Sequence, residues 1–193
     1  MARVVGIDPG TLSFDLCGLE DGKLFLDLTI PAKEIASNPQ SLVDALNAAQ
    51  PLDLVIGPSG YGLPWIPIQE FSERELFLFI LVDERERGQA SPLGGMRELI
   101  TCLLASGLPV IFAPGVIHLP TVPAYRKANK IDMGTADKLC CVALGILDQA
   151  HQHHLDYDQT SFIYVEAGGA FTAVLAVQYG QIVDGLGGSS GGP

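Results

Sequence analysis

The chain has 193 residues and a formal net charge of −11; 48% of its residues are hydrophobic and 17% are charged. This composition is typical of a globular protein with a sizeable core and excludes a disordered chain. The negative charge argues against a nucleic-acid partner, because few basic side chains are available to displace the counterions of a phosphate backbone. No apolar run approaches the roughly 20 residues of a membrane-spanning helix, and no signal peptide precedes Val4, so we expect a cytoplasmic protein with no membrane partner.

Three strands are expected at the N-terminus. A compact Val/Ile run over residues 3–8 predicts a buried strand, and strand-like runs over residues 12–19 and 24–30 follow it. The Asp21-Gly22 pair between the last two runs is typical of a tight hairpin turn. The first structural element is therefore predicted to be a set of three successive antiparallel strands.

Helices and strands alternate in the middle of the chain. The expected helices lie at residues 39–50, 70–87, 94–106 and 134–152, and the expected buried strands at residues 52–57 and 108–113. Within residues 70–87 the run FLFILV also suits a strand, so that assignment stays open. The alternation predicts a sheet with parallel members that is covered by helices.

The C-terminal part repeats the pattern of the N-terminal part. Strands are expected at residues 162–166, 171–178 and 181–184, with a glycine-bearing turn after the first and a Tyr179-Gly180 turn after the second. The same order of strands and turns thus occurs near both ends without close sequence identity. We expect a first domain at residues 1–150 and the beginning of a second domain at residues 151–193.

The turn after the first strand has the sequence Asp8-Pro9-Gly10-Thr11. Pro9 fixes its own φ, whereas Gly10 can take a positive φ and leaves room for a close approach of the backbone. The amide and hydroxyl of Thr11 could then donate to phosphate oxygens, and Asp8 could order a hydrated Mg²⁺. The alternative is an ordinary hairpin turn in which Asp8 caps its own backbone.

A second turn, in the sequence EAGGAFT, places Gly168 and Gly169 after another buried strand. Two glycine-bearing turns that face each other would clamp a polyphosphate from both sides. The pair of turns favours phosphate binding more strongly than either turn alone.

The segments IDPGTLS, EAGGAFTAVLAVQYGQIVDG and GGSSGGP resemble the phosphate-binding segments of the acetate and sugar kinase, Hsp70 and actin superfamily. Within this superfamily the chain is most similar to the acetate and butyrate kinase branch and to an uncharacterised family of predicted butyrate kinases. The resemblance implies an actin-type ATPase fold with ribonuclease H-like lobes, and ATP- and Mg²⁺-dependent transfer of a phosphoryl group to a short-chain carboxylate such as butyrate. It implies that Asp8 binds the metal and acts in catalysis, and that the cofactor is contacted by Gly10, Thr11, Ser13, Gly168, Gly169 and Thr172.

The sequence departs from the family pattern at three points. Glu166 stands where superfamily members often have an aspartate, and Ala170 replaces a third glycine. The family fold continues well beyond the second turn, whereas this chain ends at Pro193, so we expect an incomplete second lobe. Two alternatives stay open: a nucleotide-switched ATPase or binding protein of the Hsp70 or actin kind that has no small-molecule acceptor, and a relative that kept the fold but lost the nucleotide. The oligomeric state also stays open, with a homodimer as one option.

A polar segment over residues 126–138 offers further candidates for catalysis. Arg126, Lys130 or Lys138 could neutralise a transferred phosphoryl group, and Asp132 could polarise the acceptor or hold a metal. Of these residues, we take Arg126 and Asp132 as the candidate catalytic residues. The alternative is that Asp132 or Thr135 caps the helix that follows.

Several other residues have a structural interpretation. The four cysteines, which form no CxxC pair, are expected to be buried thiols in a reducing compartment: Cys17, Cys102, Cys140 and Cys141. The HQHH sequence at residues 151–154 is expected to be a solvated helix end, His118 a structural histidine, and residues 84–87 a solvated helix face. Tyr61 and Trp65 could line an acceptor pocket or pack under a loop.

Overall fold

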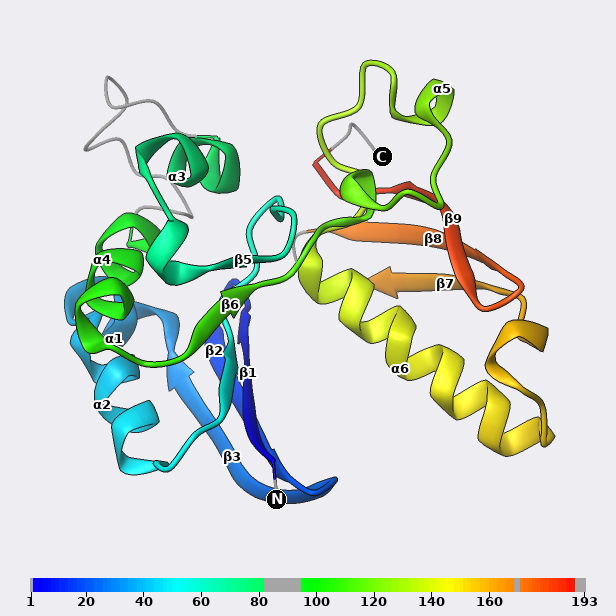
Figure 1. Ribbon diagram of the computed structural model, residues 1–193. Coiled ribbons are helices and arrows are strands. Elements are labelled where there is room, and N and C mark those ends of the chain that lie inside the picture. The colour runs from blue at the N-terminus through cyan, green and yellow to red at the C-terminus, as the bar shows by residue number, and fades with distance from the viewer. Residues whose placement is uncertain (1, 82–94, 169–170, 190–193) are drawn as a thin grey trace. The chain divides into compact units, whose positions relative to one another are not determined.

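The computed structural model describes residues 2–81, 95–168 and 171–189, and these residues form two compact units (Figure 1). The first unit contains residues 1–59 and 65–113, and the second contains residues 60–64 and 114–193. The units do not coincide with the domains expected from the sequence, because helix α6 (Ala136–His153) precedes the last three strands in the chain but packs onto them. None of the helices in the described ranges is long and apolar enough to cross a membrane.

The first unit is built on a six-stranded mixed sheet with the order β3-β2-β1-β4-β6-β5. Strands β1, β2 and β3 form the antiparallel set that the sequence predicts, β4 and β6 add in parallel, and the edge strand β5 is antiparallel to β6. The strands are β1 (Arg3–Pro9), β2 (Ser13–Glu20), β3 (Lys23–Pro31), β4 (Leu54–Ile56), β5 (Ile66–Pro67) and β6 (Val110–Phe112). The mixed sheet confirms the prediction; only the two-residue strand β5 was not expected.

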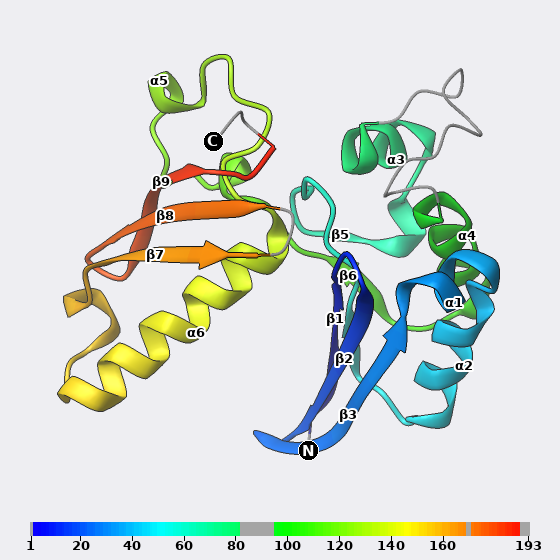
Figure 2. The same cartoon turned by 180° about the vertical axis from the view of Figure 1, so that it is seen from behind.

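The helices of the first unit gather on one side of this sheet (Figures 1 and 2). They are α1 (Ala32–Ser37), α2 (Gln40–Ala48), α3 (Glu73–Ile80) and α4 (Met96–Ser106), with a 3-10 turn at Ile68–Glu70. Helix α3 resolves the ambiguity of the FLFILV run for the described residues, because Ser72 caps the helix by accepting from the Arg74 amide. The rings of Phe71, Phe79 and Phe112 pack together between helix and sheet, with centroids 4.6–5.8 Å apart.

The second unit is a three-stranded antiparallel sheet in the order β7-β8-β9, with helix α6 alongside it (Figure 2). The strands are β7 (Phe162–Ala167), β8 (Thr172–Gln178) and β9 (Gln181–Leu186), and shorter elements are α5 (Ala124–Lys127) and 3-10 turns at Val116–His118 and Tyr157–Gln159. The core contains Val142 from the helix and Leu175 and Val177 from the sheet, with Leu139 and Ile146 packed against it. These residues of α6 form the apolar stripe by which the helix packs on the sheet.

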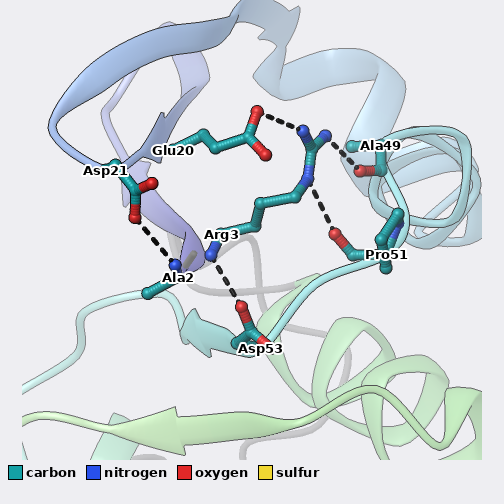
Figure 3. Close-up of polar contacts among 7 residues, drawn as sticks. All are labelled: Ala2, Arg3, Glu20, Asp21, Ala49, Pro51 and Asp53. Carbon is teal, nitrogen blue, oxygen red and sulfur yellow. Dashed lines mark hydrogen bonds and ion pairs between the residues drawn. The ribbon is translucent and has the colours of Figure 1, made fainter.

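Arg3 fixes the start of strand β1 (Figure 3). Its guanidinium donates to Glu20 Oε2 at 2.9 Å, to the carbonyl of Ala49 at 3.1 Å and to the carbonyl of Pro51 at 2.9 Å. Its own amide donates to Asp53 Oδ2 at 2.7 Å. One side chain thus ties β1 to the end of β2 and to the connection between α2 and β4, so the strand that leads to Asp8 is held firmly.

The expected burial of the cysteines is wrong. Cys17, Cys140 and Cys141 are exposed, and Cys102 is half-buried. Buried and exposed residues alternate along β2, and Cys17 is on the exposed face. On helix α6, Val142 is fully buried, whereas Cys140 and Cys141 face solvent. Residues 84–87 lie outside the described residues.

Candidate functional site

The turn Gly10–Leu12 joins strands β1 and β2, whose last pair is Pro9 and Phe14. Asp8, Gly10 and Thr11 are exposed, and the Gly10 amide donates to the Asp8 carbonyl at 3.2 Å. A Cβ on Gly10 would lie 3.0 Å from the Ser13 carbonyl, so the glycine permits a close approach of the backbone. Gly10 is not among the described glycines with a positive φ, so the close contact with the Ser13 carbonyl, rather than a left-handed backbone, favours glycine here.

Ser13 begins strand β2 and is half-buried. Its hydroxyl donates to Asp15 Oδ2 at 3.0 Å, and the Thr29 hydroxyl donates to the other oxygen of Asp15 at 2.5 Å. The Ser13 hydroxyl is therefore engaged on the strand rather than at the tip of the turn.

A small hollow of about 90 Å³ opens beside this turn. Its walls are mostly apolar, and its polar groups come from the turn and from Ser59. The lining residues are Pro9, Gly10, Thr11, Phe14, Ala32, Ile35, Ala36, Ser59, Gly95 and Met96. Exposed donors and a short apolar recess thus lie side by side within the first unit.

The second glycine-bearing turn follows strand β7. The Gly168 amide donates to the Phe171 carbonyl at 2.8 Å, and a Cβ on Gly168 would lie 3.0 Å from that oxygen. Thr172 is exposed and begins β8 opposite Ala167. Gly169 and Ala170 lie outside the described residues.

Charged groups gather just before this turn. Lys138 Nζ lies 2.5 Å from Glu166 Oε1 and 2.5 Å from Asp137 Oδ2, and the Tyr164 hydroxyl donates to Glu166 Oε2 at 2.7 Å. Burial alone would lower the pKa of Lys138, but the hydrogen bonds to Asp137 and Glu166 outweigh it and raise the pKa. Burial and the bond to Glu166 also raise the pKa of Tyr164, so both groups keep their protons at neutral pH.

Asp132 lies in the segment before helix α6 and is only 6% exposed. Its Oδ1 accepts from the Gly134 amide at 2.8 Å, and its Oδ2 accepts from the Ser189 hydroxyl at 2.6 Å and the Ser189 amide at 3.1 Å. Asp132 therefore joins the start of α6 to the glycine-rich segment after β9.

A family model described as "Protein of unknown function (DUF1464)" matches residues 6–193 of the chain. The chain belongs to the DUF1464 family. No curated protein matches this DUF1464 member. Its predicted relationship to butyrate kinases stays a prediction.

Solved structures share the fold of this DUF1464 member at low sequence identity. Acetate kinase from Entamoeba histolytica is 12% identical with a TM-score of 0.55, and the match covers 97% of this chain and 55% of that chain. A propionate kinase from Francisella tularensis subsp. tularensis SCHU S4 is 9% identical with a TM-score of 0.55, and the match covers 97% of this chain and 58% of that chain. The DUF1464 member thus spans a little over half the length of these proteins. The likeness confirms the predicted fold class, a mixed α/β fold of the actin-like ATPase type.

Most of the predicted site residues of the DUF1464 member fall into two groups. Asp8, Gly10, Thr11 and Ser13 share the β1–β2 hairpin, and Gly168 and Thr172 share the β7–β8 hairpin. Arg126 belongs to neither group. It forms an ion pair with Asp184 on β9. The pKa of Arg126 is raised, mainly by a hydrogen bond with Tyr125 and next by the negative charge of Asp184.

Sequence reasoning missed Glu166, Lys138 and Tyr164 as a cluster. A signal was present, because Tyr164 and Glu166 are two residues apart and so share one face of β7, the face that packs toward α6. Polar side chains at inward positions of a strand need partners, and Lys138 on the neighbouring helix supplies one.

The histidines behave as expected. His151, His153 and His154 are exposed at the end of α6, and the Nδ1 of His118 accepts from the Gly115 amide at 3.2 Å. Burial lowers the pKa of His118. Within the described ranges, no three His, Cys, Asp or Glu side chains group as ligands for a metal ion.

Proposed function

We propose that this DUF1464 member is an ATP-dependent phosphotransferase that phosphorylates a short-chain carboxylate such as butyrate. The observation that carries the proposal is the β1–β2 turn, where exposed Thr11 lines an apolar hollow and Asp8 is exposed on the strand that leads to the turn. Main-chain amides and a hydroxyl suit phosphate oxygens, and a small apolar recess suits an alkyl group. The shared fold of the acetate and propionate kinases supports the same reaction class.

Phosphate binding is assigned to the two glycine-bearing turns. In this proposal Gly10 and Thr11 form the first phosphate-binding turn, with the amide and hydroxyl of Thr11 as donors, and Gly168, Gly169 and Thr172 form the second. Ser13 takes part through its contact with Asp15, which supports the base of the first turn. Such sites act mainly by positioning the reacting groups and by neutralising the charge of the phosphates, because the protein itself forms few covalent bonds during phosphoryl transfer.

Asp8 is the proposed magnesium ligand. It is exposed at the end of β1, and Mg²⁺ needs only one or two protein carboxylates because it keeps several of its waters. When bound, the ion would neutralise charge on the phosphates of ATP.

The transfer itself is an in-line displacement. A carboxylate oxygen of the acceptor forms a bond to the γ-phosphorus while the bond from that phosphorus to the bridging oxygen of ADP breaks. The products are an acyl phosphate and ADP. The hollow next to the turn would hold the alkyl chain of the acceptor and leave its carboxylate at the turn. Catalytic roles for Arg126 and Asp132 stay predictions, and Arg126 would have to leave Asp184 to reach a phosphoryl group.

The proposal is tested by mixing the protein with Mg-ATP and straight-chain acids of two to six carbons, and trapping acyl phosphate with hydroxylamine. We expect hydroxamate to form with at least one short acid and to fall about 10-fold or more in Thr11→Val, which loses a donor to the phosphate. Thr101→Val is the matched control, because among the described residues the Thr101 hydroxyl bonds only to the Arg97 carbonyl on helix α4. ATP hydrolysis that is indifferent to every acid would contradict the proposal and favour a nucleotide-switched ATPase.

A further inference from the structure

The buried carboxylate of Asp132 holds the segment that follows strand β9. Three donors converge on this carboxylate: the Gly134 amide, the Ser189 amide and the Ser189 hydroxyl. The Asp132 carbonyl also accepts from the Gly187 amide at 3.3 Å. A buried carboxylate is costly unless it is hydrogen-bonded, so these bonds account for its presence at 6% exposure.

Glycines in this segment and at the end of β9 allow the chain to lie against residues 132 and 133. A Cβ on Gly187 would lie 1.8 Å from Asp132 Oδ1, and a Cβ on Gly185, within β9, would lie 1.9 Å from the Met133 carbonyl. Neither position has space for any side chain. We call residues 187–189 the glycine segment.

The glycine segment in turn lies against the hairpin between β7 and β8. A Cβ on Gly188 would lie 2.4 Å from the Phe171 Cβ, so segment and hairpin touch at this point. The Phe171 carbonyl accepts from the Gly168 amide and thereby closes the hairpin. Continuous contact therefore runs from Asp132 through the glycine segment and Phe171 to Gly168.

We infer that Asp132 is a positioning residue: it holds the glycine segment against Phe171 and so sets the conformation of the hairpin at Gly168. The inference rests on the proposed function only where Gly168 is said to bind phosphate. In this inference Asp132 does not polarise the acceptor, because both of its carboxylate oxygens already accept hydrogen bonds from the protein. Positions 185, 187 and 188 then require glycine for packing, whatever the glycine segment does with a nucleotide.

The test uses the whole chain and two variants. Asp132→Asn keeps an oxygen for the Gly134 amide but turns an NH₂ group toward the Ser189 amide, where two donors oppose each other. Ser189→Ala is the milder variant, because Ser189 is exposed and only its hydroxyl bond is lost. Asp148→Asn is the control, since within the part of the chain that the structure describes the Asp148 side chain bonds only to Gln152 on the surface of α6.

The first measurement is amide hydrogen exchange. We expect the Gly168 amide to exchange about 10-fold faster or more in Asp132→Asn and less so in Ser189→Ala, with amides of β1 and the control unchanged. If the Gly168 amide keeps its wild-type exchange rate and chemical shift in both variants, the inference is overturned. This measurement needs no catalysis, so it stands even if the protein transfers no phosphoryl group.

The second measurement separates positioning from direct catalysis. A positioning role raises the KM for Mg-ATP in both variants while kcat falls much less. Loss of kcat in Asp132→Asn at unchanged KM and unchanged Gly168 exchange would instead make Asp132 a catalytic residue and overturn the inference.

Discussion

Lys138 on helix α6 and Glu166 on strand β7 form an ion pair, with Nζ 2.5 Å from Oε1. Asp137 and Tyr164 complete the surroundings: the first accepts from the same ammonium group, and the second donates to the other oxygen of Glu166. Glu166 precedes Gly168 by two residues, so the helix and the strand are joined just where the second turn begins. Both oxygens of Glu166 are thereby engaged, which fixes the position of its carboxylate just before the turn.

Removal of the Lys138 charge should destabilise the second unit. Lys138→Met leaves two carboxylates together, and because these side chains are only 16–30% exposed we expect a loss of about 1–3 kcal/mol in the free energy of unfolding. Urea unfolding at neutral pH measures the change. Lys138→Arg keeps the charge and should lose less, and adding Glu166→Gln to Lys138→Met should restore part of the stability. Equal stability of Lys138→Met and wild type would show that the ion pair contributes nothing.

Local features of the fold could be predicted from the sequence. The hairpins at Asp21-Gly22 and Tyr179-Gly180 were predicted from residue types alone, and in both pairs each residue has a positive φ, as such two-residue turns require. Helix α4 ends at Gly107, which also has a positive φ. These signals depend only on neighbours in the chain.

The features that the sequence did not reveal depend on distant residues. Asp132 and Ser189 are 57 residues apart, and the pairing of Lys138 with Glu166 requires α6 to pack on β7. That packing also puts α6 in the second unit, whereas the order of elements along the chain suggests that α6 belongs with the residues before it. Helix α1 was missed since it begins directly after β3 without a side chain that caps it.

Alanine should affect the two hairpin turns differently. Gly22 and Gly180 have φ values of 78° and 69°, but a Cβ on Gly22 meets nothing within 4 Å, whereas a Cβ on Gly180 would lie 2.3 Å from the Tyr157 carbonyl. Gly22→Ala should cost about 1 kcal/mol for its strained φ. Gly180→Ala should cost about 1–3 kcal/mol more, because the Tyr157 backbone must also shift. Thermal and urea unfolding of the two variants measure the difference, and equal losses would mean that the contact at Tyr157 relaxes freely.

Lysine should not replace Arg3. The guanidinium bonds simultaneously to Glu20 and to the carbonyls of Ala49 and Pro51, and a single ammonium group cannot reproduce that planar arrangement (Figure 3). We expect Arg3→Lys to lose about 1–2 kcal/mol in the free energy of unfolding. Arg74→Lys is the control, because the Arg74 side chain is 81% exposed and its change should be close to zero. A similar loss in both variants would argue against a specific role of the Arg3 contacts.

A larger side chain in the hollow should shift the preference of the protein toward acids with a shorter chain. Ala36 lines the hollow beside the β1–β2 turn and is exposed on helix α1, so Ala36→Leu puts a larger side chain there at little cost to the helix. We expect kcat/KM for four-carbon acids to fall about 10-fold relative to two-carbon acids. Ala45→Leu is the matched control, because Ala45 lines a different hollow next to Arg3 and Phe25. An unchanged ratio would place the alkyl chain elsewhere.

His118 should make the stability of the protein depend on pH. Burial, together with the nearby charge of Lys127, lowers the pKa of His118 in the folded protein below its value of about 6.5 in the unfolded chain. The unfolded state then binds the proton first, so the stability that neutral His118 gives is fully present above about pH 6.5 and is lost as the pH falls through the folded pKa. His118→Gln cannot titrate, and the difference in the free energy of unfolding between wild type and this variant should therefore shrink between pH 7.5 and 5. Urea unfolding at several pH values measures it, with His153→Gln as the control, because His153 is exposed at the end of α6. A difference that stays constant across this range would show that His118 has the same pKa in the folded and unfolded protein.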